Sequence, residues 1–343
     1  AEAADEFVQE AAEHGCVWYS RVRSKTGQAE LEKALDATKF SELLEHGHAF
    51  ALPPPTATAY WNLGELEEEI KRASVVGDKH GPFLRLAELL GPLECRMQMQ
   101  IGSDEQRVPG QGSSDRKHTM RTWLEQVDPS LPRRPEVPDK LLHWPVGQSP
   151  RIEKLLKLPS WLNQANWLAD RQLCPGCKEV DTKLQLVHAH QKTPYHRDNG
   201  GKDTWMKLLV GQVLVACWSQ DDGEAYGLHD NMLDYASDER ANVPLDWACF
   251  RCMPSARLFL LEQGEVLVMP CGTYHYVYTS QRKIVVASDF LNDAGWERRR
   301  QCLERDCKIS VGNKSFDKTT DLDGIKKRWV QREERHANGE PDT

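Results

Sequence analysis

The feature that most constrains the fold is a series of short apolar runs between residues 183 and 291, separated by glycines and prolines. Leu184, Leu186 and His188 alternate along one run, and two further runs meet at Gly211 and Gln212. Side chains alternate between the two faces of a strand, so this pattern is typical of short β-strands joined by tight turns. Many strands of this kind predict a sandwich or a barrel.

The sequence on either side of these strands has helical periodicity. Apolar residues recur at three- and four-residue spacing in residues 1–50, and residues 61–70 and 83–90 carry similar patterns. We therefore expect a mainly β protein with flanking helices (α+β). Three parts are predicted: a helical N-terminal region with Pro-rich linkers (1–150), a β-rich domain (151–292), and C-terminal helices with a charged tail (293–343).

The charge balance gives no strong nucleic-acid footprint. The chain carries 44 Lys and Arg against 52 Asp and Glu, a net charge of -8, which suits a basic partner better than a nucleic acid, although many proteins carry such a charge without a partner of this kind. No apolar run reaches the length of a membrane span, and the acidic N-terminus lacks the pattern of a secretory signal. Ten cysteines without secretory features are expected to be thiols or metal ligands. A nuclear location is predicted, with the cytoplasm as the alternative.

Two histidines and an aspartate stand out within the β-rich part. His196 and Asp198 lie two residues apart, in the motif Thr-Pro-Tyr-His-Arg-Asp at 193–198, so on a strand both side chains leave the same face. His275 follows 79 residues later, behind the turn residues Pro270 and Gly272. Either histidine alone is more often an ordinary packed or surface residue. Together, two His and one carboxylate are the ligand set of non-haem Fe(II) oxygenases.

Over residues 180–292 the sequence resembles the JmjC-domain 2-oxoglutarate oxygenases, and among them the lysine demethylases. The resemblance runs through residues 193–211, 261–279 and 287–291. It implies a double-stranded β-helix of the cupin or jelly-roll type, with Fe(II) on His196, Asp198 and His275. It also implies 2-oxoglutarate beside the metal and hydroxylation of a substrate C–H bond. A hydroxylated N-methyl group breaks down to formaldehyde, which completes a demethylation.

The resemblance therefore implies an Fe(II)- and 2-oxoglutarate-dependent dioxygenase that demethylates methyl-lysine on a basic peptide such as a histone tail. A protein or RNA hydroxylase on the same fold is the first alternative. The second alternative is a catalytically silent JmjC-like module that binds chromatin. The complete ligand set favours an enzyme.

The residues expected to contact the co-substrate follow the family pattern only in part. Thr193 matches the family's hydroxyl that contacts the co-substrate carboxylate, and Thr204 lies on the same face as His196 by strand parity. The family usually places a lysine two residues after the glycine turn, where this chain has Val213. Burying the 2-oxoglutarate dianion without a cation is costly, so Val213 favours the silent module.

Two lysines are candidates to replace the missing cation. Lys283 lies eight residues after His275, a spacing that points it inward along an unbroken strand, and it is the preferred candidate. Lys207 is the second candidate, although its parity suggests the opposite face. If both lie on the surface, the co-substrate binds weakly or not at all.

Cysteine pairs suggest a structural zinc site. Two Cys-x-x-Cys pairs have knuckle spacing and together offer four thiolates: Cys174 with Cys177, and Cys249 with Cys252. Some JmjC proteins hold a zinc ion between the region before the last histidine and the segment after it, so Cys302 and Cys307 are alternative partners for the second pair. The other interpretation is reduced, packed thiols. His188 and His190 are expected to be structural, with a ligand role as the alternative.

Overall fold

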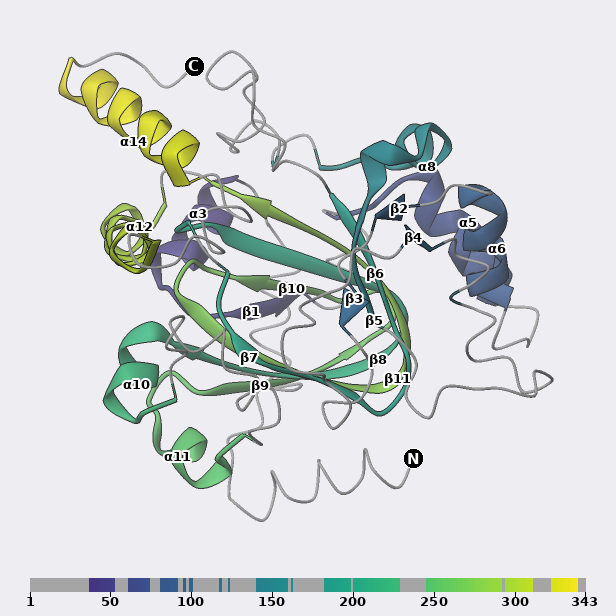
Figure 1. Ribbon diagram of the computed structural model, residues 1–343, viewed down its shortest axis with the longest axis horizontal. Helices are drawn as coiled ribbons and strands as arrows, with labels where there is room; N and C mark the ends of the chain where they lie inside the picture. Colours follow the sequence, from purple (N-terminus) through teal and green to yellow (C-terminus); the bar gives the residue numbers. More distant parts are fainter. Residues whose placement is uncertain are drawn as a thin grey trace.

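The computed structural model describes residues 37–52, 61–74, 81–91, 95–96, 99–100, 117–118, 123, 140–159, 162, 182–198, 200–228, 245–291, 294–310 and 322–338. Its centre is a barrel of antiparallel strands, with helices packed outside it (Figure 1). None of the helices in the described part of the chain combines the length and apolarity that crossing a membrane requires.

Two long strands build both layers of the barrel because each bends in the middle. In the first layer, the early half of β8 (Asp203–Ser219) lies between β10 (Val266–Met269) and the late half of β11 (Thr273–Phe290). In the second layer, the late half of β8 pairs with the early half of β11 and with β9 (Arg257–Glu262).

Two short strands complete the barrel. β6 (Lys183–Val187) pairs with the late half of β11 in the first layer, and β7 (Gln191–His196) pairs with its early half in the second. The order is thus β6–β11–β8–β10 in one layer and β7–β11–β8–β9 in the other. This is the strand order of a double-stranded β-helix, and the predicted jelly-roll fold class is confirmed.

The bend of β8 depends on a glycine. Gly211 has a φ of +96°, and a Cβ built there would lie 2.2 Å from the backbone oxygen of Arg282 on β11. A side chain at this position is excluded both by the φ angle and by the neighbouring strand.

The first layer contains more strands than expected because strands from the N-terminal region join it. β1 (Phe50–Leu52) pairs with β10, β5 (Lys140–Pro145) pairs with β6, and β3 (Met99–Gln100) pairs with β5. β2 (Cys95–Arg96) and β4 (Lys117–His118) form a separate two-stranded sheet. β1, β3 and β5 all lie before residue 151, so the N-terminal part of the chain also contributes strands to the sheet.

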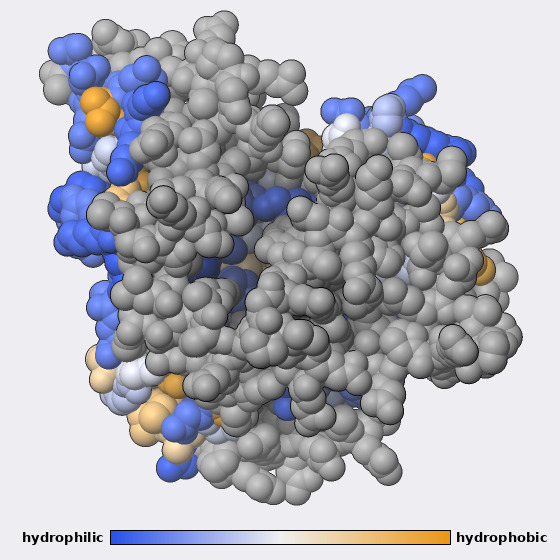
Figure 2. Space-filling model, in the orientation of Figure 1, coloured by the Kyte–Doolittle hydropathy of each residue, from blue (hydrophilic) through white to orange (hydrophobic). Residues whose placement is uncertain are grey.

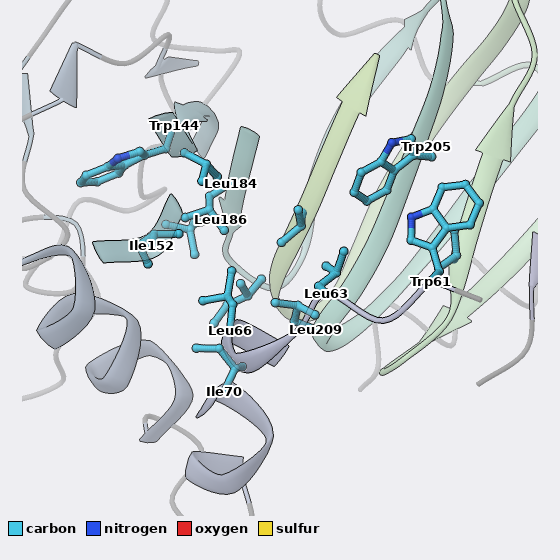
Figure 3. Close-up of a cluster of buried hydrophobic side chains, with 14 of the residues drawn as sticks. Trp61, Leu63, Leu66, Ile70, Trp144, Ile152, Leu184, Leu186, Trp205 and Leu209 are labelled. Carbon is cyan, nitrogen blue, oxygen red and sulfur yellow. The ribbon is translucent and has the colours of Figure 1, made fainter. Parts of the chain in front are cut away.

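Helices cover the outer face of the first layer. They are α3 (Ala37–Glu45), α5 (Glu65–Ser74), α6 (Gly81–Leu90) and α8 (Pro150–Leu155), which follows the short 3-10 helix η2 (Val146–Gln148). Leu66 and Ile70 of α5 belong to one buried cluster with Leu184, Leu186 and Leu209 of the sheet (Figure 3). Their i, i+4 spacing gives α5 its apolar stripe, while Glu65 and Glu68 are exposed on the other side of the helix.

The outer face of the second layer is aromatic. Trp218 and Tyr274 stack there, with ring centroids 6.0 Å apart, and Phe250 of α11 (Trp247–Cys252) packs on Trp218. α10 (Gln220–Ala225) directly follows β8.

Two C-terminal helices complete the described structure. α12 (Trp296–Ser310) and α14 (Leu322–Ala337) pack through Trp296 and Trp329, whose rings stack with their centroids 3.7 Å apart. Their surface is mostly hydrophilic in Figure 2, although Val330 of α14 is half exposed. Between the barrel layers lies a third cluster, formed by alternate residues of β8 and β11 such as Val213, Val215, Val277 and Val285.

Candidate metal centre

Neighbouring strands place two imidazoles side by side at one end of the barrel interior. His196 ends β7, and His275 lies directly opposite it on β11. Their ring centroids are 4.2 Å apart, with the ring planes at 57°. Paired residues of antiparallel strands share one face of the sheet, and that face is the inside of the barrel here.

A β-bulge in β7 turns both Thr193 and His196 inward. Thr193 pairs with Val277 while His196 pairs with His275, so β7 uses one more residue than β11 over this stretch. Tyr195 points the other way and contacts Trp218 of the outer aromatic cluster. Without the bulge, two residues three apart would leave opposite faces of the strand.

Asp198 completes a group of three ligands just beyond the end of β7. The ligand atoms of His196, Asp198 and His275 all lie within 4.8 Å of one another. Burial lowers the pKa of His275 to about 4, helped by the charge of His196, so this imidazole is neutral at pH 7. Burial opposes the ionised form of Asp198, but His275, His196 and a hydrogen bond from Thr204 hold its pKa below the usual range.

These protonation states and atoms fit a divalent metal ion. Metal ligands must be neutral imidazoles and ionised carboxylates. The Nδ1 of His275 lies 3.4 Å from the backbone oxygen of Thr273, which accepts a hydrogen bond from Nδ1–H and leaves Nε2 for the metal. Two His and one carboxylate on one side of an ion leave its other positions open to exogenous ligands.

Two buried ion pairs fix the loop that carries Asp198 to α12. Arg197, between the two ligands in sequence, pairs with Asp306, whose Oδ2 also accepts from the Gly200 amide at 2.6 Å. Arg299 pairs with Asp203 at 2.6 Å and donates to the Gly201 carbonyl at 2.7 Å. α12 therefore holds the ligand loop in place.

Thr204 lies next to the ligands, and its hydroxyl is engaged. Its Oγ1 is 2.6 Å from Asp198 Oδ2 and 3.1 Å from Asp289 Oδ1. Asp289 is in turn contacted by Lys202 at 3.1 Å and Lys183 at 3.4 Å. The Thr204 hydroxyl thus contacts the carboxylate of a candidate metal ligand, and its contact with a co-substrate stays a prediction.

Lys283 lies inside the barrel. It is 2% exposed, and Val285 and Ala287, which follow it at spacings of two, belong to the interior cluster. Its charge contributes to the lowered pKa of His275, so the ammonium lies within electrostatic reach of the ligands. Val213 is also in the interior, on the other layer, where it adds only apolar surface.

Lys207, the second candidate for a co-substrate contact, has partners outside the barrel, in agreement with the opposite face that its parity suggests. Its Nζ donates to the Trp61 carbonyl at 2.8 Å and to Glu67 Oε2 at 2.6 Å. It pairs across the sheet with Val266 and Val286, which belong to the outer cluster. Strand parity places its ammonium outside the barrel, where it anchors α5.

The cysteine pairs are only partly described. Cys174 and Cys177 lie outside the described residues, so the four-thiolate zinc site stays a prediction. Cys249 and Cys252 lie one turn apart on α11, half-buried and exposed. Cys302 is buried against Cys271 and contacts Gln220 Oε1 at 3.6 Å, and Cys307 is half-buried.

The two other histidines named from the sequence, His188 and His190, lie in the turn between β6 and β7. His188 stacks on Trp123 with ring centroids 4.0 Å apart, and His190 Nδ1 lies 3.1 Å from the Tyr278 hydroxyl. Sequence reasoning overlooked Asp289, Lys202, Arg299 and Asp306. Only Asp289 carried a visible signal, because it shares the inward parity of Lys283 on the same strand.

Comparison with known proteins gives distant relatives. No family model matches the chain. A JmjC domain-containing histone demethylation protein 1 of Aspergillus fumigatus is 21% identical over 231 residues, covering 65% of this chain and 15% of the relative. A protein of the same name from Caenorhabditis elegans is 23% identical, over 61% of this chain and 20% of the relative.

A third relative is lysine-specific demethylase 7A of Danio rerio, 22% identical over 35% of this chain and 13% of its own length. The matched region thus spans a fifth or less of each of these relatives. With the jelly-roll barrel and the His-Asp-His group, these matches support a JmjC-like family for this chain.

Proposed function

We propose that this protein is an Fe(II)- and 2-oxoglutarate-dependent dioxygenase that demethylates methyl-lysine on histones by hydroxylating the N-methyl group. The observation that carries the proposal is the meeting of His196, Asp198 and His275 inside the barrel. The relatives named as histone demethylation proteins support the substrate class. A bound iron would supply the oxidation of a C–H bond with O2, while the protein supplies binding and orientation.

The chain's own residues would prepare the site in two ways. His275 and Asp198 offer ligand atoms in the protonation states that a metal needs, without a proton to displace at pH 7. The barrel interior then supplies apolar surface beside the ligands. The apolar interior cluster adjoins the ligands, since Val277 lies two residues from His275 on the same face.

Lys283 is the proposed partner of the distal carboxylate of 2-oxoglutarate. It supplies a buried ammonium in place of the lysine that the family carries at Val213. Thr193, turned inward by the bulge, is proposed as a hydroxyl contact to the same co-substrate. A dianion needs such partners to enter a barrel interior.

A basic peptide such as a histone tail is the proposed partner, and the nucleus the proposed location. The chain's net charge of -8 would favour approach of a positively charged segment. Zinc on Cys174, Cys177, Cys249 and Cys252 is proposed as a structural cofactor. A second candidate function is a catalytically silent chromatin-binding module, because Val213 stands where the family usually has the lysine that pairs with the co-substrate.

Calorimetry with 2-oxoglutarate separates these functions. The protein is loaded with Mn(II) under anaerobic conditions and titrated, with His275→Ala as the matched control. An enzyme should bind the co-substrate, and with Fe(II) and methylated histone peptides it should form succinate and formaldehyde. Absence of binding at millimolar 2-oxoglutarate would overturn the dioxygenase proposal and leave the silent module.

A further inference from the structure

The carboxylate of Asp198 is held by a hydroxyl group that a second buried carboxylate also contacts. Thr204 Oγ1 lies 2.6 Å from Asp198 Oδ2, the distance of a strong hydrogen bond to a charged acceptor. An oxygen that already accepts a short hydrogen bond is a poorer metal ligand. The contact therefore directs coordination to Oδ1 and favours one-oxygen binding by Asp198.

Thr204 is fixed by the sheet and by Asp289. Thr204 on β8 and Asp289 on β11 are paired residues, and their side chains approach to 3.1 Å inside the barrel. Lys202 holds Asp289 at 3.1 Å, and both of these side chains are about nine-tenths buried. Because bulk water is nearly excluded, the hydroxyl cannot exchange its partners for solvent.

A hydroxyl carries one hydrogen, so Thr204 donates to one carboxylate at a time. Burial opposes ionisation of Asp289, but Lys202 and Lys183 keep its pKa well below its usual range, so Asp289 stays an acceptor. Lys202 and Lys183 neutralise the negative charge of Asp289, so its carboxylate can lie beside the Thr204 oxygen when the hydroxyl donates to Asp198. Asp289 thereby limits the orientations of the threonine that faces the metal ligand.

We propose that Thr204, held by Asp289, is a positioning residue that fixes which oxygen of Asp198 is presented to the metal. This inference rests on the proposed metal centre. It assigns to Thr204 a role different from co-substrate binding. Hydrogen-bonded partners of metal ligands typically contribute 10- to 100-fold to metal affinity.

The test uses Co(II) binding to the full chain by calorimetry and absorption, without co-substrate or substrate. Thr204→Val should weaken Co(II) binding about 10-fold or more and change the absorption bands that report coordination number. Thr204→Ser keeps the hydroxyl and should stay within about threefold of the wild type. The matched control is Thr279→Val, a buried threonine opposite Val213, which should leave affinity and spectrum unchanged.

Circular dichroism shows whether each variant is folded. If Thr204→Val does not fold, the serine variant still tests the proposal. Wild-type affinity and spectrum in Thr204→Val, or loss of both in Thr204→Ser, would overturn the positioning role. If the wild-type protein itself bound no Co(II), the proposed metal centre would fail instead.

A double-mutant cycle tests the part assigned to Asp289. If Asp289 acts through Thr204, Asp289→Asn should weaken Co(II) binding less in the Thr204→Val background than in the wild type. Equal factors in both backgrounds would mean that Asp289 acts through its charge alone, and would remove it from the proposal.

Discussion

At the residue scale, the face on which a side chain lies decides its role. Lys283 and Lys207 are both buried lysines in the same sheet, yet one belongs to the interior and the other to the packing of α5. Strand parity separates them, as does the electrostatic effect of Lys283 on His275. The two lysines should therefore respond differently to the same substitution.

Lys283→Met should weaken 2-oxoglutarate binding at least 10-fold, because the proposed partner of the distal carboxylate is removed, a loss of about 1.4 kcal/mol or more. Lys207→Met is the matched control. It should leave the co-substrate affinity of the folded protein unchanged but lower the free energy of unfolding by about 3 kcal/mol, since Glu67 loses its buried partner. Calorimetry and urea denaturation check both values. Unchanged affinity in Lys283→Met would remove it from the co-substrate site.

His188 should make the fold sensitive to mild acid. Burial lowers its pKa to about 3, against 6.5 when unfolded, so the folded state favours the neutral ring. A lowered pKa stabilises the fold above pH 6.5, and this contribution is lost as the pH falls toward 3. Between pH 7 and pH 5 the loss is about 2 kcal/mol.

Urea unfolding at both pH values checks this prediction. His188→Phe keeps the ring stacking on Trp123 but cannot titrate, so its stability should fall by about 2 kcal/mol less than that of the wild type. Equal losses in the two proteins would contradict the assignment.

At the element scale, bent strands and one helix determine the site. The bend in β8 lets one strand serve both layers, and α12 holds the loop that follows β7. Periodicity and glycines are local signals, and they predicted the strands, their turns and a sandwich or barrel; the jelly-roll class came from the family resemblance. The bulge in β7 is defined by pairing with residues about 80 positions away, and the ion pairs to α12 join residues about 100 positions apart, so no local pattern predicts them.

Gly211→Ala should destabilise the barrel by more than about 2 kcal/mol, because the positive φ alone costs 1–2 kcal/mol and the added Cβ would overlap the Arg282 carbonyl. Gly227→Ala is the control, with a φ of +75° and no atom within 4 Å of the added Cβ. Gly227→Ala should lower the free energy of unfolding by about 1 kcal/mol. Similar losses of unfolding free energy in the two variants would show that the bend does not require glycine.

Asp306→Ala should lower the free energy of unfolding by about 3 kcal/mol, because it leaves Arg197 buried without its partner. It should also weaken metal binding, since Arg197 lies between His196 and Asp198. Glu304→Ala removes an exposed partner of Arg300 on the same helix and should change stability by less than about 1 kcal/mol. Equal effects of the two substitutions would contradict the role given to α12.

At the scale of the whole molecule, the sheet is one body with contributions from both ends of the chain. Strands from before residue 151 extend its first layer, and α12 fixes the loop that carries Asp198. The three-part organisation stays a prediction, and the strands of one sheet come from both sides of residue 151. The site therefore depends on α12, which lies outside the stretch that carries the sequence resemblance.

The most direct test of the central claim is the number of Mn(II) ions bound per chain, measured by electron paramagnetic resonance titration. The account predicts one tightly bound ion in the wild-type protein and its loss in His196→Ala, Asp198→Ala and His275→Ala alike. Binding of the same ion with unchanged affinity after any of these three substitutions would contradict it.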